Sequence, residues 1–163
     1  MNGSIFVSTR RCGEFSNSAG GGMFNYVPFS FVITCGMTWL KEVKKLDAVF
    51  SRYIRLSRAD ENGIATCITC GCKKPWKEQQ CGHFMSRSHY SVRFDELNCD
   101  VQCVKCNMFR QGESYIFSLR LDEKHGEGTA EMLHQKSKQS QKIPKEELIE
   151  MRKEYQKKFD GLR

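Results

Sequence analysis

The chain has 163 residues and 39% hydrophobic content, enough for one modest domain with appendages but not for several large domains. A formal net charge of +7 favours an anionic partner, and nucleic acid is the commonest such partner for a basic protein of this size. No convincing signal peptide precedes the nine cysteines, and the apolar run at 26–36 is too short to span a bilayer. We therefore expect a reduced cytoplasmic protein, with no membrane partner, whose cysteines bind metal.

Residues 1–36 differ in composition from the rest of the chain. They are rich in Gly, Ser and Phe, contain few charges, and sustain no helical or strand period. We expect a poorly ordered tail here, or an extension that precedes a natural start at Met37.

A basic amphipathic helix is predicted within residues 37–66. Its apolar face is marked by spacings of four and three between Trp39, Val43, Leu46, Phe50 and Tyr53. The other faces are basic, and form either a solvated surface or a strip that lies along phosphates. The candidate DNA contacts there are Lys44, Lys45 and Arg52.

Helices are also predicted over the C-terminal region, residues 113–163. One ends near Gly126, and a short second helix follows with Thr129 as its cap. The last begins after a proline and places Leu148, Met151, Tyr155, Phe159 and Leu162 on one face. With the cysteine-rich centre at 67–112, the pattern indicates an α+β fold in which helices dominate.

Two Cys-x-x-Cys hooks predict a structural zinc site. Zinc prefers four soft ligands in a tetrahedron, and such a site can contribute roughly 10–16 kcal/mol of apparent binding energy to folding. The predicted ligands are Cys67, Cys70, Cys103 and Cys106. Cys72 and Cys81 flank the hooks as alternative ligands, whereas Cys12, Cys35 and Cys99 look unpaired.

Polar residues around the second hook suggest hydrolytic chemistry. His83 lies on a candidate hairpin strand, Asn98 precedes Cys103 by five residues, and Asn107 directly follows Cys106. This combination resembles the HNH, or ββα-metal, nuclease motif, and so implies a small treble-clef-like zinc core flanked by amphipathic helices. Phosphodiester hydrolysis needs a base, a group that orients it, and a divalent cation. His83 would be the base, Asn98 would position its imidazole or pin the loop, and Asn107 would offer an oxygen to Mg²⁺ or Mn²⁺.

Longer stretches resemble one family. WLKEVKKLDAVFSRYIRLSRAD, CITCG, CGHFMSRSHYSVRFDELNCDVQCVKCN and HGEGTAEMLHQKSKQ together look like the NinG/Rap recombination protein family of lambdoid phages. The resemblance runs from about Trp39 to the C-terminus. It implies a divalent-metal-dependent endonuclease for branched recombination intermediates, including Holliday junctions and D-loops. It also implies phage or host recombination proteins as partners, and a location on DNA in the host cytoplasm.

The catalytic metal site departs from the usual motif. Many HNH enzymes place an acidic metal ligand just before the first histidine, where this chain has Gly82. Another ligand must therefore come from His89, Asp95 or Glu96, and the sequence does not choose between them. Cys12 and Cys35 lack hook spacing, so no second zinc site is predicted.

Other readings of the same residues stay open. Phosphate contact and solvated surface charge are alternatives for Arg87, Arg93, Lys105 and Arg110. The chain could instead be a non-catalytic zinc module that binds nucleic acid, RNA included.

A symmetric junction needs two cuts, which favours a homodimer. The helices at Trp39–Leu56 and Leu148–Leu162 either supply its interface or pack on each other within one chain.

Overall fold

A computed structural model describes the backbone of residues 29–163 and the side chains of residues 38–163. The first long helix, α1, runs over Phe29–Ser57, so it begins ahead of its predicted start at Met37. Most of the predicted extension at 1–36, together with Cys12, lies outside the described residues.

The remaining elements form small sheets and further helices, as an α+β fold requires. Strands β1 (Ile64–Thr66) and β2 (Lys73–Pro75) form one antiparallel pair, and β3 (Gln80–His83) and β4 (Cys99–Gln102) form the other. The helices after β3 are α2 (Tyr90–Arg93), α3 (Ser114–His125), α4 (Thr129–Ser137) and α5 (Lys145–Gly161). Within the described range, no helix has the length and apolar character that a membrane crossing requires.

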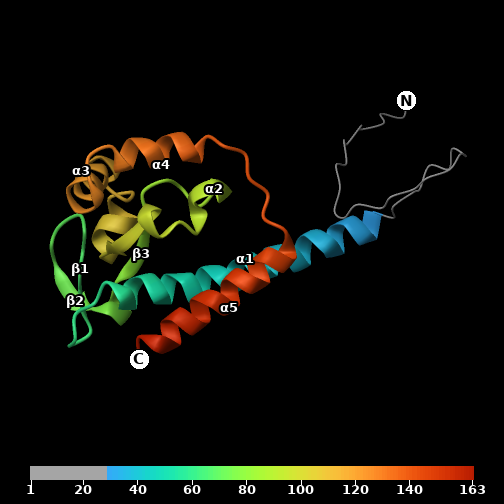
Figure 1. Cartoon of the computed structure of the whole chain (residues 1–163), viewed down its shortest axis with the longest axis horizontal. Coiled ribbons are helices and arrows are strands. Elements are labelled where there is room, and N and C mark those ends of the chain that lie inside the picture. The colour runs from blue at the N-terminus through green and yellow to red at the C-terminus, as the bar shows by residue number, and fades with distance from the viewer. Residues whose placement is uncertain (1–28) are drawn as a thin grey trace, which may run out of the picture.

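Helices α1 and α5 pack on each other within the chain (Figure 1). The predicted apolar faces meet there: Leu46 and Phe50 of α1 are buried with Leu148 and Tyr155 of α5. The Trp39 indole Nε1 closes one end of the pair by donating to the Ile143 carbonyl at 2.9 Å. Of the two arrangements that the sequence permits for these helices, the structure therefore shows the intramolecular one.

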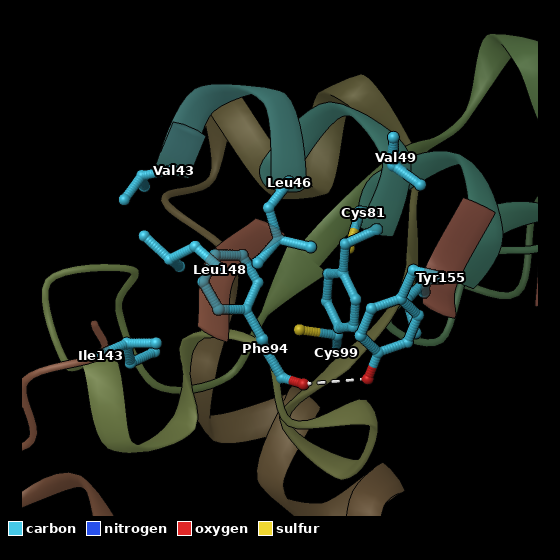
Figure 2. Close-up of a cluster of buried hydrophobic side chains, with 11 residues drawn as sticks. Val43, Leu46, Val49, Cys81, Phe94, Cys99, Ile143, Leu148 and Tyr155 are labelled. Carbon is cyan, nitrogen blue, oxygen red and sulfur yellow. Dashed lines mark hydrogen bonds between the residues drawn. The ribbon is translucent and has the colours of Figure 1, made fainter. Parts of the chain in front are cut away.

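The β3–β4 hairpin lies between this helix pair and the α3–α4 pair (Figure 1). Because side chains alternate along a strand, Cys81 and His83 point to one face of β3, and Gln80 and Gly82 to the other. The first face joins the core beneath α1, where Cys81 and Cys99 are buried (Figure 2). The hairpin thus presents two chemically different faces to its neighbours.

The start of α4 differs in one detail from the prediction. Gly128, with a φ of 86°, is the residue that caps the helix, and Thr129 is its first helical residue. The Thr129 hydroxyl instead donates to the Gly126 carbonyl at 2.7 Å. Glycine suits the left-handed conformation because it has no Cβ.

Candidate functional site

The two cysteine hooks converge on one point. The sulfur atoms of Cys67, Cys70, Cys103 and Cys106 all lie within 4.8 Å of one another. Zinc–sulfur bonds of about 2.3 Å give a tetrahedron whose edges are about 3.8 Å long. The Sγ atoms of Cys70 and Cys103 are 3.8 Å apart, which matches such an edge. The cluster can therefore hold a structural metal such as zinc.

Tight turns bring each hook around the cluster. Gly71, with a φ of 72°, turns the chain after the first hook, and its amide donates to the Cys67 carbonyl at 2.9 Å. In the second hook the Cys106 amide points at the Cys103 Sγ, 3.5 Å away. The Ile68 amide donates to the Val101 carbonyl at 2.8 Å and so fixes the first hook to β4.

The thiols of the cluster differ in their environments, and burial raises the pKa of Cys106, one of the four cluster cysteines, as it raises that of Cys72. A hydrogen bond from the backbone of Cys72 lowers the pKa of Cys70 to about 6, which favours the thiolate that a metal needs. Burial raises the pKa of Cys72 to about 12, and its side chain packs beside the cluster. The other alternative ligand, Cys81, lies away from this cluster in the core beneath α1.

His83 is oriented through both of its ring nitrogens. Its Nε2 lies 3.2 Å from the Arg93 carbonyl oxygen, and its Nδ1 lies 3.4 Å from the Arg87 Nε. A carbonyl only accepts and a guanidinium only donates, so the proton sits on Nε2 and the lone pair on Nδ1. Burial, reinforced by the charge of Arg87, lowers the pKa of His83 to about 4. The imidazole is therefore neutral at pH 7.

Asn98 is fully buried and holds the loop that leads out of β3. Its Oδ1 accepts from the Met85 amide at 2.7 Å, and its Nδ2 donates to the carbonyls of Met85 and Val92 at 3.0 Å. Sequence reasoning gave Asn98 two possible roles, and these contacts correspond to the pinned loop.

Asn107 lies against β3, next to a residue that sequence reasoning missed. Its Nδ2 donates to the Gln80 Oε1 at 2.6 Å. Gln80 and His83 are three residues apart on the strand, so they point to opposite faces. The structure therefore does not bring His83 and Asn107 to one face: Asn107 adjoins Gln80 on one side of the hairpin, whereas the imidazole lies on the α1-facing side.

Gln102 explains why glycine precedes His83. A Cβ on Gly82 would overlap with the Gln102 side chain, so no acidic ligand fits there. The Gln102 Nε2 donates to the Thr69 Oγ1 at 2.6 Å and to the Gly112 carbonyl at 2.8 Å. This buried amide therefore connects the hairpin to both sides of the cysteine cluster.

The candidate acidic ligands are paired with lysines. Asp95 accepts from Lys136 of α4 at 2.5 Å, and Glu96 accepts from Lys158 of α5 at 3.1 Å. His89 is exposed at the N-terminal end of α2. The contacts of the two carboxylates thus anchor the C-terminal helices to the segment before β4.

Most of the candidate DNA contacts lie on the surface, and one does not. Exposed side chains belong to Lys44, Lys45, Arg52, Arg87, Lys105 and Arg110. Among them, Lys45 pairs with Glu42 at 2.7 Å and Arg110 pairs with Glu113 at 3.1 Å. Arg93 instead forms an ion pair within the protein: its Nη2 donates to the Asp47 Oδ2 at 2.6 Å, and its side chain is only 14% exposed.

Comparison with known proteins identifies the family. A model of the bacteriophage lambda NinG protein matches residues 36–163. The chain belongs to the NinG family. It is also similar to protein ninG of Salmonella phage P22, with 26% identity over 126 residues. That alignment covers 77% of this chain and 58% of the P22 protein. No solved structure matches the chain.

The region matched by the NinG model contains a second group of possible metal ligands. Cys81, His83 and Cys99 place their ligand atoms within 4.8 Å of one another. Cys99 therefore has neighbours that the sequence did not assign to it. The signal was weak: a Cys-x-His spacing on a strand puts two ligands on one face, but only the register with β4 adds the third.

Proposed function

We propose that this NinG-family chain is a metal-dependent endonuclease that cleaves branched DNA, including Holliday junctions and D-loops, during phage recombination. The observation that carries the proposal is the orientation of His83. The Arg93 carbonyl holds Nε2–H, so the basic nitrogen is Nδ1, beside an exposed arginine. A neutral imidazole with one nitrogen fixed is oriented as a general base is, and its lowered pKa makes it a weak base in the absence of DNA.

The order of elements supports an HNH-like, treble-clef site. The hairpin β3–β4 is followed by the second hook and by a π-helical segment, Lys105–Phe109, which carries Asn107. Asn107 would hold Mg²⁺ or Mn²⁺ through its amide oxygen, while its Nδ2 donates to Gln80 and so fixes the orientation of the amide. Because Asn107 and His83 lie on opposite sides of β3, such a cation would stabilise the charge on the phosphate attacked by the water that His83 activates only if the DNA backbone reached both sides of the hairpin. The zinc cluster would keep the hook and the hairpin in register.

DNA would be gripped through surface charge. Lys105 and Arg110 flank the second hook, and Arg87 adjoins the proposed base, so a phosphate near Nδ1 would meet a guanidinium. A junction has two-fold symmetry, and two copies of the chain would cut its two strands. Binding would take place on DNA in the host cytoplasm.

One specific observation favours a second candidate function. Gly82 has no room for an acidic ligand, and Asp95 and Glu96 are each paired with a lysine. A site without a carboxylate holds a divalent cation weakly. The alternative is therefore a non-catalytic zinc module that binds nucleic acid and serves as a recombination accessory protein.

A cleavage assay on a synthetic four-way junction distinguishes the two functions. With Mg²⁺ or Mn²⁺, we expect cleavage by the wild type and a loss of about 10²- to 10⁴-fold in His83→Ala. Lys153→Ala, on the exposed surface of α5, is the matched control and should cut like wild type. Junction binding without cleavage in either metal would favour the accessory protein. Equal cleavage by His83→Ala would exclude His83 as the base.

A further inference from the structure

We propose that Cys81, His83 and Cys99 form a second metal site, on the α1-facing side of the hairpin, that binds a soft cation such as Zn²⁺. The site shares no ligand with the cluster of the two hooks. It would give the chain two bound zinc ions.

The hairpin places the three ligands without any change in the backbone. Cys81 and His83 are two residues apart on β3 and therefore share a face, and His83 is paired with Cys99 across the ladder. All three ligand atoms already lie within 4.8 Å of one another. A zinc tetrahedron needs separations of about 3.5–3.8 Å between its ligand atoms, so displacements of about 1 Å, produced by side-chain rotation, would close it.

The charge of the donor set suits its surroundings. Cys81 is 2% exposed and Cys99 is 1% exposed, in a core that includes Phe94 and Tyr155 (Figure 2). Two thiolates, a neutral imidazole and Zn²⁺ sum to zero charge, so the complex buries no net charge in that core. Two buried cysteines by themselves could simply fill the core as small apolar side chains. A polar imidazole beside them adds nothing to such packing, so its presence favours a metal site.

An oxygen atom lies where a fourth donor is needed. The Arg93 carbonyl oxygen is 3.2 Å from the His83 Nε2 and 4.0 Å from the Cys99 Sγ. It therefore borders two of the three ligands. Metal binding would move the imidazole proton from Nε2 to Nδ1 and displace the Arg87 guanidinium, which is also a donor. The fourth position of the tetrahedron would be filled by the Arg93 carbonyl or by a water molecule.

Zinc stoichiometry tests the site in the full chain. After saturation with Zn²⁺ and removal of free metal, we expect two zinc ions per wild-type chain by elemental analysis. Cys99→Val should keep the core filled and lower the value to one. Cys72→Ser is the matched control, because Cys72 adjoins the other cluster without being among its four ligands, and it should retain two.

Cobalt substitution provides a second measurement. Wild type offers six thiolates, four from the hooks and two from the hairpin, so Cys81→Ala/Cys99→Val should lose about a third of the thiolate-to-cobalt charge-transfer absorption. One zinc per wild-type chain would overturn the proposal, even if the variants fail to fold. So would unchanged cobalt absorption in a folded double variant.

Discussion

Arg93 and Asp47 form a two-point ion pair that joins helix α2 to helix α1. The Arg93 Nη2 lies 2.6 Å from the Asp47 Oδ2, and its Nε lies 3.1 Å from the Asp47 Oδ1. The Nη1 of the same guanidinium donates to the Arg87 carbonyl at 2.6 Å. Because the backbone carbonyl of Arg93 orients His83, helix α1 helps to position the imidazole.

Removing the charge of Asp47 should loosen this connection. Asp47→Asn is expected to reduce the free energy of unfolding by about 1–3 kcal/mol, because a largely buried guanidinium loses its charged partner. Chemical denaturation measures the change. Lys44→Ala, an exposed position on the same helix, serves as the control and should alter stability by about 0.5 kcal/mol at most. An equal loss in both variants would contradict the structural role of the pair.

Filling the space above Gly82 should destabilise the hairpin. We expect Gly82→Ala to lower the free energy of unfolding by about 1–3 kcal/mol, because the new Cβ overlaps with the Gln102 side chain. Gln102→Ala removes that obstruction but also two hydrogen bonds, so it is destabilising by itself. In a double-mutant cycle the combined loss should be smaller than the sum of the single losses. Strict additivity would show that the overlap is relieved elsewhere.

Metal removal should unfold the centre of the chain. A zinc site contributes roughly 10–16 kcal/mol, which exceeds the stability of most small domains. A strong chelator is therefore expected to remove amide protection over residues 67–112 in hydrogen-exchange experiments. Cys70→Ser should lose this protection even with zinc present, whereas Cys72→Ser should keep it, since only Cys70 belongs to the four-thiol cluster.

Phosphate contacts should be visible in the salt dependence of DNA binding. If Lys105 contacts a phosphate, Lys105→Gln lowers the slope of log K against log salt by about 0.9. Lys153→Gln, whose lysine pairs with Glu150 on α5, should leave the slope unchanged. Junction binding by filter retention between low and moderate salt gives both slopes. Identical slopes for the two variants would remove Lys105 from the DNA surface.

Excess zinc should inhibit cleavage if both proposals hold. A cation bound to the His83 Nε2 leaves a proton on Nδ1, so the imidazole can no longer act as a base. We expect junction cleavage in Mg²⁺ to fall as Zn²⁺ is added, and Cys99→Val to resist this inhibition. A wild type that is active at full zinc occupancy would show that the two roles of His83 do not compete.

The helices and the hooks are the parts of the fold that sequence reasoning predicts well. Apolar spacings of four and three define the packed faces of α1 and α5, because a helix turns once every 3.6 residues. Hook spacing likewise indicates Cys67, Cys70, Cys103 and Cys106, which the structure brings together. Both signals are local, so they do not depend on how distant segments meet.

The surroundings of His83 could not be predicted, because they depend on contacts between segments. The strand register puts Cys99 opposite His83, and this register is set by the whole hairpin. Lys136 and Lys158 reach Asp95 and Glu96 from helices that lie some 40 and 60 residues away along the chain. The partner of Arg93 could not be predicted either, since the sequence around this basic residue gives no sign of an acidic partner on α1.

The packing of α1 on α5 has a consequence for synthesis. Trp39 and Ile143, which close the helix pair, are separated by 104 residues. At translation rates of about 5–20 residues per second, α1 waits on the order of 5–20 s before its partner leaves the ribosome. During that interval the apolar side chains of Leu46 and Phe50 lack their C-terminal cover, so a nascent chain is most exposed to chaperones and to self-association before its last helix emerges.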